Sequence, residues 1–221
     1  MHPDAVVLEP SVPATAAVIW LHGLGADGND FVPVVEELRL PATLPIRFVF
    51  PHARQRPVTI NNGYVMRAWY DISGGPRGMV EDEAGIRESE SVVHGYIERE
   101  LAAGIRSERI VIAGFSQGGA IALQTGLRYP QPLAGVMALS TYLPLRDSLA
   151  AEASPANRSL PILICHGTHD GVLPMSLGSS TRDLLTEMGY NVEWRSYAME
   201  HSVCMEEIAH ISGWLQARLS Q

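Results

Sequence analysis

Short apolar runs alternate with longer segments of mixed polarity along the whole chain. Most of the short runs are nearly continuously apolar, which is typical of strands covered on both faces of a parallel sheet. They lie at residues 17–21, 46–50, 109–113, 135–139, 162–166 and 192–197. The longer segments carry apolar residues at helical spacing, at residues 31–38, 86–101, 120–128, 177–188 and 203–219. This alternation predicts a mostly parallel, doubly wound α/β sheet.

The length of the chain sets the expected number of domains. With 221 residues it is long enough to bury one sizeable core, and one domain over residues 1–221 is expected. Pieces rich in Gly and Pro, such as residues 74–78, are too short for domain linkers and are read as loops. Apolar residues make up 46% and charged residues 18% of the chain, a composition that argues against disorder.

Charge and cysteine content narrow the classes of partner and the compartment. The formal charge is -8 and no block of Lys and Arg occurs, so no nucleic-acid partner is expected. The first residues lack a secretory signal and no apolar stretch is long enough for a span, which predicts a cytoplasmic protein without stable membrane insertion. The only cysteines, Cys165 and Cys204, are expected to be reduced thiols.

The strongest chemical signal is the segment Gly-Phe-Ser-Gln-Gly-Gly at residues 114–119, between a predicted strand and a predicted helix. A nucleophilic serine requires this context, because the sharp turn exposes its hydroxyl while glycines two residues on either side leave room for the neighbouring strand and helix. The alternative is a glycine-rich turn that happens to contain a serine. The setting favours Ser116 as a nucleophile.

A serine hydroxyl needs a base, and a histidine oriented by an acid is the usual one. In this arrangement the order along the chain is serine, acid, histidine. Asp170 follows the predicted strand 162–166, and His201 follows the predicted strand 192–197. These positions predict Asp170 as the acid and His201 as the base, with Asp147 as the fallback acid. Three competing histidines are His166 and His169, which fall on the wrong side of the acid, and His210, which lies inside the last predicted helix.

Cleavage of an ester also requires hydrogen-bond donors for the developing oxyanion. One is expected from the residue after the nucleophile, the N–H of Gln117. The other is expected from the loop of residues 22–25, His-Gly-Leu-Gly, which leaves the first predicted strand, and is assigned to the N–H of Leu24. The alternative for this loop is a simple flexible turn. No cluster of His, Cys, Asp and Glu at ligand spacing is evident, so no metal is expected.

Several segments together resemble the phospholipase/carboxylesterase family, which includes the acyl-protein thioesterases. They are residues 21–25 (Leu-His-Gly-Leu-Gly), 114–120, 166–170 and 201–204, with 69–71 (Trp-Tyr-Asp) and 139–144 in addition. The similarity extends from about residue 17 to about residue 215. It implies the α/β-hydrolase fold without a large cap domain, no cofactor, and activity on carboxylic esters or long acyl thioesters.

The same resemblance implies where the acyl group of a substrate lies. It places the group near Ile72, Tyr142 and Val172, under a loop formed by residues 72–79. The alternative is that these apolar side chains only pack the rim of the site. Tyr142 stands where some relatives carry tryptophan, which implies an acyl channel of different shape.

The sequence therefore predicts a serine hydrolase that transfers an acyl group to water through an acyl-enzyme. A small-molecule ester and an acylated protein are both candidate substrates, and a homodimer is compatible with the sequence. A lysophospholipase-type lipid esterase is an alternative activity, and a serine peptidase is disfavoured because the chain lacks room for an additional selecting domain. From another class, a non-catalytic binding module with the same fold is the alternative, since fold alone does not fix function.

Overall fold

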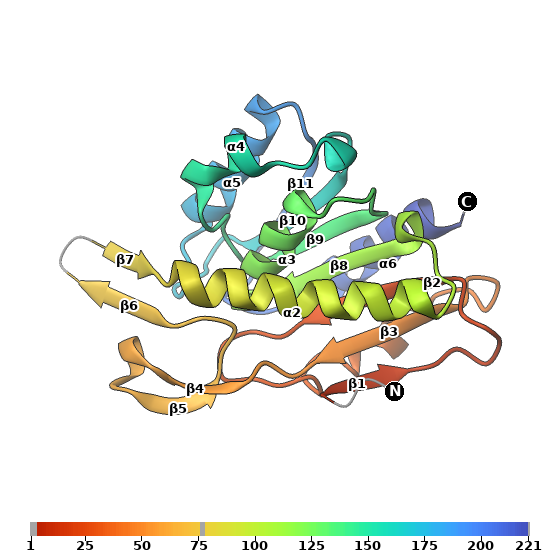
Figure 1. Ribbon diagram of the computed structural model, residues 1–221, viewed down its shortest axis with the longest axis horizontal. Helices are drawn as coiled ribbons and strands as arrows, with labels where there is room; N and C mark the ends of the chain where they lie inside the picture. The colour runs from red at the N-terminus through yellow and green to blue at the C-terminus, as the bar shows by residue number, and fades with distance from the viewer. Residues whose placement is uncertain (1–3, 76–77, 221) are drawn as a thin grey trace.

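The computed structural model describes residues 4–75 and 78–220 and is built around one large sheet (Figure 1). Its described strands run in the order β1-β3-β2-β8-β9-β10-β11. They are β1 (Ala5–Leu8), β2 (Ala16–Leu21), β3 (Ile46–Pro51), β8 (Ile110–Phe115), β9 (Gly135–Leu139), β10 (Pro161–Gly167) and β11 (Asn191–Tyr197). Only the edge strand β1 pairs antiparallel within this sheet, so the predicted mostly parallel α/β sheet is confirmed.

The strand order reverses beside β2, and this reversal determines where the site lies. From β2 the chain passes first to β3 on one side, and it later returns to place β8 on the other side. In the register of β2 and β8, Leu21 lies opposite Gly114 at the carboxyl ends of both strands. The loops that follow these strands therefore leave at a topological switch point, where open α/β sheets bind ligands.

Helices cover both faces of the sheet, which explains why its central strands are apolar on both sides. One face is covered by α2 (Glu83–Ala102), α3 (Gln117–Arg128) and α5 (Met175–Glu187), and the other by α1 (Val34–Glu37) and α6 (Met205–Leu219). The short helix α4 (Leu149–Glu152) packs against α3. Two apolar cores result, one on each side of the sheet.

Two small hairpins lie at one end of the molecule, away from the chain termini (Figure 1). They are formed by β4 (Gln55–Val58) with β5 (Tyr64–Arg67), and by β6 (Ile72–Gly75) with β7 (Gly78–Glu81). The expectation of a loop at residues 72–79 is therefore wrong, although residues 76–77 lie outside the described part. The hairpin depends on backbone pairing of Ile72 with Glu81 and Ser73 with Val80, and its glycines hide the alternation that indicates a strand.

The predicted helices and strands match observed ones to within three residues at either end. The predicted helix 31–38 is shortened most in proportion, to α1, because Pro33 disfavours a helical backbone at the residue before it and the helix starts at Val34. The predicted strand 109–113 begins one residue later, since Arg109 closes a 3-10 turn, η2 (Ser107–Arg109). Three further 3-10 turns are described, η1 (Thr59–Asn61), η3 (Arg146–Ser148) and η4 (Pro155–Asn157).

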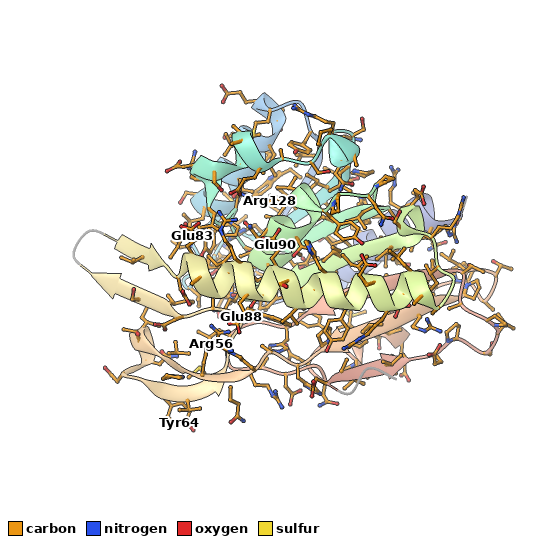
Figure 2. All side chains as sticks on the ribbon, viewed as in Figure 1. Arg56, Tyr64, Glu83, Glu88, Glu90 and Arg128 are labelled. Atoms are coloured by element: carbon orange, nitrogen blue, oxygen red, sulfur yellow. The ribbon has the colours of Figure 1, made fainter. Side chains whose placement is uncertain are left out.

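The helix α2 carries many charged side chains, and of those labelled in Figure 2, Glu83 and Glu88 are exposed whereas Glu90 is half-buried. Arg56 of β4 reaches toward this helix, with Nη2 at 3.2 Å from Oε2 of Glu88. The charged side chains explain why even this long helix is not a candidate membrane span. Within the described residues, no helix combines the length and apolar character that crossing a membrane requires.

Candidate active site

Ser116 occupies the turn between β8 and α3 in an unusual backbone conformation. Its φ of 53° and ψ of -120° are strained for a residue with a side chain. A Cβ on Gly114 would lie 2.2 Å from the carbonyl oxygen of Gly118, and one on Gly118 would lie 2.4 Å from that of Leu21. The two glycines thus allow the strand, the turn and the helix to approach closely, and the turn holds the Ser116 hydroxyl clear of them.

Hydrogen bonds from the next strand hold this strained turn in place. The Ser116 N–H donates to the carbonyl oxygen of Leu139 at 2.8 Å. The Thr141 hydroxyl donates to the carbonyl oxygen of Ser116 at 2.6 Å. Both partners belong to the end of β9 or the residues just after it, so the serine is fixed from the neighbouring strand as well as from its own.

The side chains of Ser116, His201 and Asp170 form one continuous chain of hydrogen bonds. The Ser116 Oγ lies 2.9 Å from Nε2 of His201, and Nδ1 of His201 lies 2.7 Å from Oδ2 of Asp170. The structure therefore brings together, from three separate loops, the three residues that the sequence predicts as nucleophile, base and acid. This geometry allows the histidine to accept the hydroxyl proton while the carboxylate holds the opposite ring nitrogen.

The surroundings of Asp170 keep its carboxyl ionised. Burial opposes ionisation, but the hydrogen bond with His201 and those from backbone N–H groups outweigh it and lower the pKa of Asp170 below its usual value. The backbone donors are Leu173 at 2.8 Å and Val172 at 2.9 Å, both to Oδ1. One carboxylate oxygen is thus anchored to the backbone and the other is left for the histidine.

The fallback acid and the three competing histidines are not part of the hydrogen-bonded chain of Ser116, His201 and Asp170. Asp147 is exposed in η3, and His169 is exposed beside Asp170. His166 is fully buried, with Nε2 at 2.8 Å from the carbonyl oxygen of Leu173 and 3.5 Å from Oδ2 of Asp170. His210 lies in α6, where its Nδ1 is 2.9 Å from the Tyr197 hydroxyl. His166 therefore packs against the acid, and His201 is the histidine that contacts the serine.

The two expected oxyanion donors flank the serine. Gln117 is the first residue of α3, where an N–H has no acceptor within the helix and the helix dipole is positive. Leu24 lines the same cavity as Ser116. A Cβ on Gly23 would lie 3.2 Å from the Phe115 ring and 3.5 Å from Cβ of Ser116, so the loop carrying Leu24 is packed closely against the serine turn.

His22 supports this loop in a way that its position in the sequence does not reveal. Its Nε2 accepts a hydrogen bond from the Ala53 N–H at 3.0 Å, so in the neutral ring Nδ1 carries the proton and donates to the carbonyl oxygen of Gly23 at 2.7 Å. Burial lowers the pKa of His22 to about 4, which keeps the ring neutral. Because the peptide is planar and trans, fixing the Gly23 carbonyl also fixes the direction of the Leu24 N–H.

Trp69 and the side chain of Gln117 complete this buried network. The Trp69 indole N–H donates to the carbonyl oxygen of His22 at 2.9 Å. Oε1 of Gln117 accepts from the Trp69 N–H at 2.7 Å, and its Nε2 donates to the carbonyl oxygen of Tyr70 at 2.8 Å. Residues 69–71 belong to the resemblance to the family, which gives them no role. The structure shows that Trp69 and Tyr70 connect the two loops expected to provide oxyanion donors.

A cavity of about 270 Å³ opens beside the serine, and most of its wall is apolar. The residues predicted to contact an acyl group, Ile72, Tyr142 and Val172, all line it together with Ser116 and His201. The apolar lining also includes Leu24, Tyr70, Phe115 and Leu173, and Asp30 contributes a carboxyl group. The shape and polarity suit a hydrocarbon chain attached to a carbonyl at the serine.

Neither cysteine is part of this arrangement. Cys165 is buried, Cys204 is half-buried, and both are free thiols. Across residues 4–75 and 78–220, no three His, Cys, Asp or Glu side chains are grouped so that they could hold a metal ion.

The sheet, the strained serine turn and the hydrogen-bonded Ser, His and Asp side chains define a serine hydrolase of the α/β-hydrolase class. A family model described as phospholipase/carboxylesterase matches residues 2–219. The chain belongs to this family, whose members are hydrolases of ester and thioester bonds, and it is an enzyme of that kind.

Named relatives and solved structures agree with this assignment. The chain is 45% identical over 215 residues to acyl-protein thioesterase 1 of Neurospora crassa, covering 93% of this chain and 87% of that protein. It is 37% identical to acyl-protein thioesterase 1 of Yarrowia lipolytica over the full length of both. The crystal structure of Zea mays acyl-protein thioesterase 2 superposes with a TM-score of 0.86 at 30% identity, covering 97% of this chain and 98% of that one. Arabidopsis thaliana SOBER1 gives 0.86 at 33% identity, over 92% and 99%.

Proposed function

We propose that the chain hydrolyses acyl thioesters and oxygen esters through a covalent acyl-enzyme on Ser116. His201 takes the hydroxyl proton as Oγ attacks the carbonyl carbon, and the N–H groups of Leu24 and Gln117 bind the resulting oxyanion. Collapse of the intermediate breaks the bond to the leaving thiol or alcohol, which receives the proton from His201. Asp170 holds the imidazole in the required tautomer throughout.

Water then hydrolyses the acyl-enzyme with the help of the same groups. His201 removes a proton from water, the hydroxide attacks the acyl carbon, and the oxyanion forms again between the same two donors. When the intermediate collapses, Ser116 Oγ leaves with the proton from His201, and the free carboxylic acid departs. No cofactor is needed for either half of the reaction.

The observation that carries this proposal is that the hydrogen-bonded side chains of Ser116, His201 and Asp170 lie at the edge of an apolar cavity. The Ser116 to His201 distance of 2.9 Å and the His201 to Asp170 distance of 2.7 Å are direct hydrogen bonds. The same serine and histidine line a cavity of about 270 Å³. A non-catalytic binding module would require neither an ionised acid behind the histidine nor a strained serine turn.

An acylated protein is the substrate that we propose, because the relatives that are 45% and 37% identical to this chain are named acyl-protein thioesterases. The cavity is large enough for an acyl chain but not for a polypeptide, so the protein carrying the thioester would remain outside it. We also propose that residues 1–221 form one domain and act in the cytoplasm. Both cores pack on one sheet, and the two free thiols suit a reducing compartment.

A matched set of substrates tests this proposal. Octanoyl groups are presented as an aryl oxygen ester, as a simple thioester and as a thioester on a peptide cysteine, and product release is measured for the wild type and for His201→Ala. We expect turnover of all three by the wild type, highest kcat/KM for the thioesters, and loss of all three in the variant. Turnover of the oxygen ester alone would contradict the thioesterase assignment while leaving esterase activity intact.

A further inference from the structure

A second cleft shares one wall residue with the catalytic cavity. It has a volume of about 230 Å³ and is lined by Glu81, Tyr142, Leu143, Arg146, Leu177, Ser180, Thr181 and Leu184. Among the described residues, Tyr142 alone lines both this cleft and the cavity that contains Ser116. Tyr142 is therefore the residue that the walls of two spaces of similar size share, and this shared residue is called the partition.

Tyr142 is held in position from its side chain and from the backbone on both sides. Its hydroxyl lies 3.0 Å from the hydroxyl of the fully buried Tyr70, and its exposed fraction is 9%. The preceding residue, Thr141, is tied to the backbone of Ser116. The following residue, Leu143, donates its N–H to the Thr181 hydroxyl at 2.9 Å. The partition is thus anchored to the serine turn on one side and to α5 on the other.

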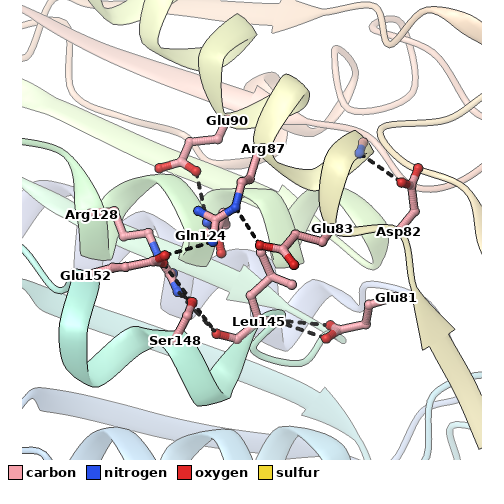
Figure 3. Close-up of polar contacts among 11 residues, drawn as sticks. Glu81, Asp82, Glu83, Arg87, Glu90, Gln124, Arg128, Leu145, Ser148 and Glu152 are labelled. Carbon is pink, nitrogen blue, oxygen red and sulfur yellow. Dashed lines mark hydrogen bonds and ion pairs between the residues drawn. The ribbon is translucent and has the colours of Figure 1, made fainter.

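The segment beyond Tyr142 is also fixed, as Figure 3 shows. The Leu145 N–H lies 3.3 Å from both carboxylate oxygens of Glu81 in β7. The Leu145 carbonyl oxygen accepts from Arg128 of α3 at 3.2 Å, and Arg128 also donates to the Ser148 hydroxyl at 3.0 Å. These contacts tie the segment that follows Tyr142 to β7 and to α3.

The volume of the catalytic cavity limits the chain that it can enclose. A methylene group is similar in size to a water molecule, which occupies about 30 Å³ in the liquid, so a cavity of about 270 Å³ holds roughly nine carbon atoms. Each methylene that enters an apolar cavity raises binding up to about fourfold. A carbon that passes beyond the filled cavity returns to water and gains nothing.

We propose that Tyr142 determines the longest acyl chain that this enzyme can enclose, by closing the catalytic cavity against the second cleft. The preferred substrates are then medium-chain acyl groups, close to octanoyl and decanoyl. Removal of the ring would connect the two spaces and nearly double the enclosed volume, with Leu143, Leu177 and Leu184 on the new apolar wall. This proposal rests on the proposed hydrolysis at Ser116.

The experiment measures kcat/KM for p-nitrophenyl esters from acetate to palmitate, each below its micelle concentration. For the wild type we expect a rise to octanoate or decanoate and no increase beyond. For Tyr142→Ala we expect the maximum to move to myristate or palmitate, with at least a tenfold gain in the ratio of palmitate to octanoate. Tyr142→Phe is the matched control, because it removes the hydroxyl pair with Tyr70 but keeps the ring, and its optimum should equal that of the wild type.

A second substitution distinguishes two causes of a changed chain-length optimum: a cavity extended into the second cleft, and an active site that has lost its packing. Ser180 is exposed and lines the second cleft, so Tyr142→Ala combined with Ser180→Phe should refill it and return the optimum toward octanoate. An unchanged optimum in Tyr142→Ala, or a wild type that already prefers palmitate, would overturn the proposal. Labelling by a fluorophosphonate probe, measured in parallel, shows that each variant keeps a folded site; a wild type that neither labels nor hydrolyses any ester would instead refute the proposed function.

Discussion

Nδ1 of His22 lies 2.7 Å from the carbonyl oxygen of Gly23 and orients the peptide whose N–H belongs to Leu24. The ring is buried, and its Nε2 is occupied by the Ala53 N–H. His22 therefore has a defined tautomer and a single orientation, although it does not contact the Ser116 hydroxyl. This relationship makes His22 a positioning residue for one of the two proposed oxyanion donors.

Substitution of His22 tests this positioning role. His22→Ala should lower kcat by about 10²-fold, because a misdirected donor loses much of what an oxyanion contact contributes, while KM changes little. His22→Asn should recover part of the rate, since its amide nitrogen occupies the place of Nδ1. Steady-state kinetics on one aryl ester provide the measurement. An increase in KM at unchanged kcat would show that His22 shapes the binding of substrate and not the oxyanion site.

Replacing each aspartate by asparagine tests whether Asp170 or Asp147 is the acid that orients His201. Asp170→Asn should lower kcat by up to about 10⁴-fold, because the amide favours the wrong tautomer of His201. Asp147→Asn should leave kcat near the wild-type value, since this carboxylate is exposed in η3. Circular dichroism of both variants checks the fold. A larger loss in Asp147→Asn than in Asp170→Asn would contradict the assignment of the acid.

The pH dependence of stability gives a separate test of Asp170. Because its folded-state pKa is lowered below the usual value of a carboxyl group, Asp170 stays ionised well into the acidic range. Its contribution to stability is complete above its unfolded pKa and is lost only as the pH falls through the lowered folded pKa. Thermal unfolding monitored from neutral to acidic pH should therefore show a smaller acid-induced loss of stability in Asp170→Asn than in the wild type. Equal losses would mean that Asp170 is not held ionised by its partners.

Glu207 provides a prediction about stability. Its side chain is fully buried in α6, and burial raises the pKa of its carboxyl from 4.5 to about 8, although contacts with the Cys165 thiol and the Cys204 backbone favour the charged form. The folded state thus keeps the proton that the unfolded state loses, so stability is complete below the unfolded pKa and falls as the pH rises toward 8.

Glu207→Gln removes this titration. We expect the variant to match the wild type near pH 4 and to exceed it by several kcal/mol, on the order of 3–4, near pH 8. Urea unfolding at the two pH values measures the difference. Glu206→Gln, at the exposed neighbouring position, is the control and should show no pH-dependent gain. A gain of the same size at both pH values would indicate improved packing instead of a removed charge.

Chelation tests the prediction that the reaction needs no metal. Incubation with EDTA should leave kcat/KM unchanged, because serine, histidine and aspartate supply the nucleophile, the proton transfer and the charge stabilisation. Loss of activity that added zinc restores would show that a metal takes part.

The sequence predicted the parallel sheet because its central strands are buried on both faces and lie in uninterrupted apolar runs. The same reasoning located Ser116, Asp170 and His201, since each follows a recognisable strand. The hairpins β4–β5 and β6–β7 were not predicted, because their strands have only four residues each and each hairpin forms by pairing between its own two strands. Local pattern contains no information about such pairing.

The hydrogen bonds and the shared cavity wall that surround the site could not be predicted from the sequence either. The hydrogen bonds of His22 to Ala53, and of Gln117 to Trp69, join residues that lie 31 and 48 positions apart. The shared wall at Tyr142 depends on how β7, α5 and the segment after β9 meet in space. Residue type and spacing indicate what chemistry is available, whereas these contacts depend on tertiary packing.

The most direct test of the account is to locate the covalent adduct of a fluorophosphonate probe by peptide mass spectrometry. The account predicts one modified peptide, with the phosphonyl group on the Oγ of Ser116, absent after heat denaturation and absent in Ser116→Ala. Labelling that persists in folded Ser116→Ala, or an adduct on any other residue of the native enzyme, would contradict the assignment of the nucleophile.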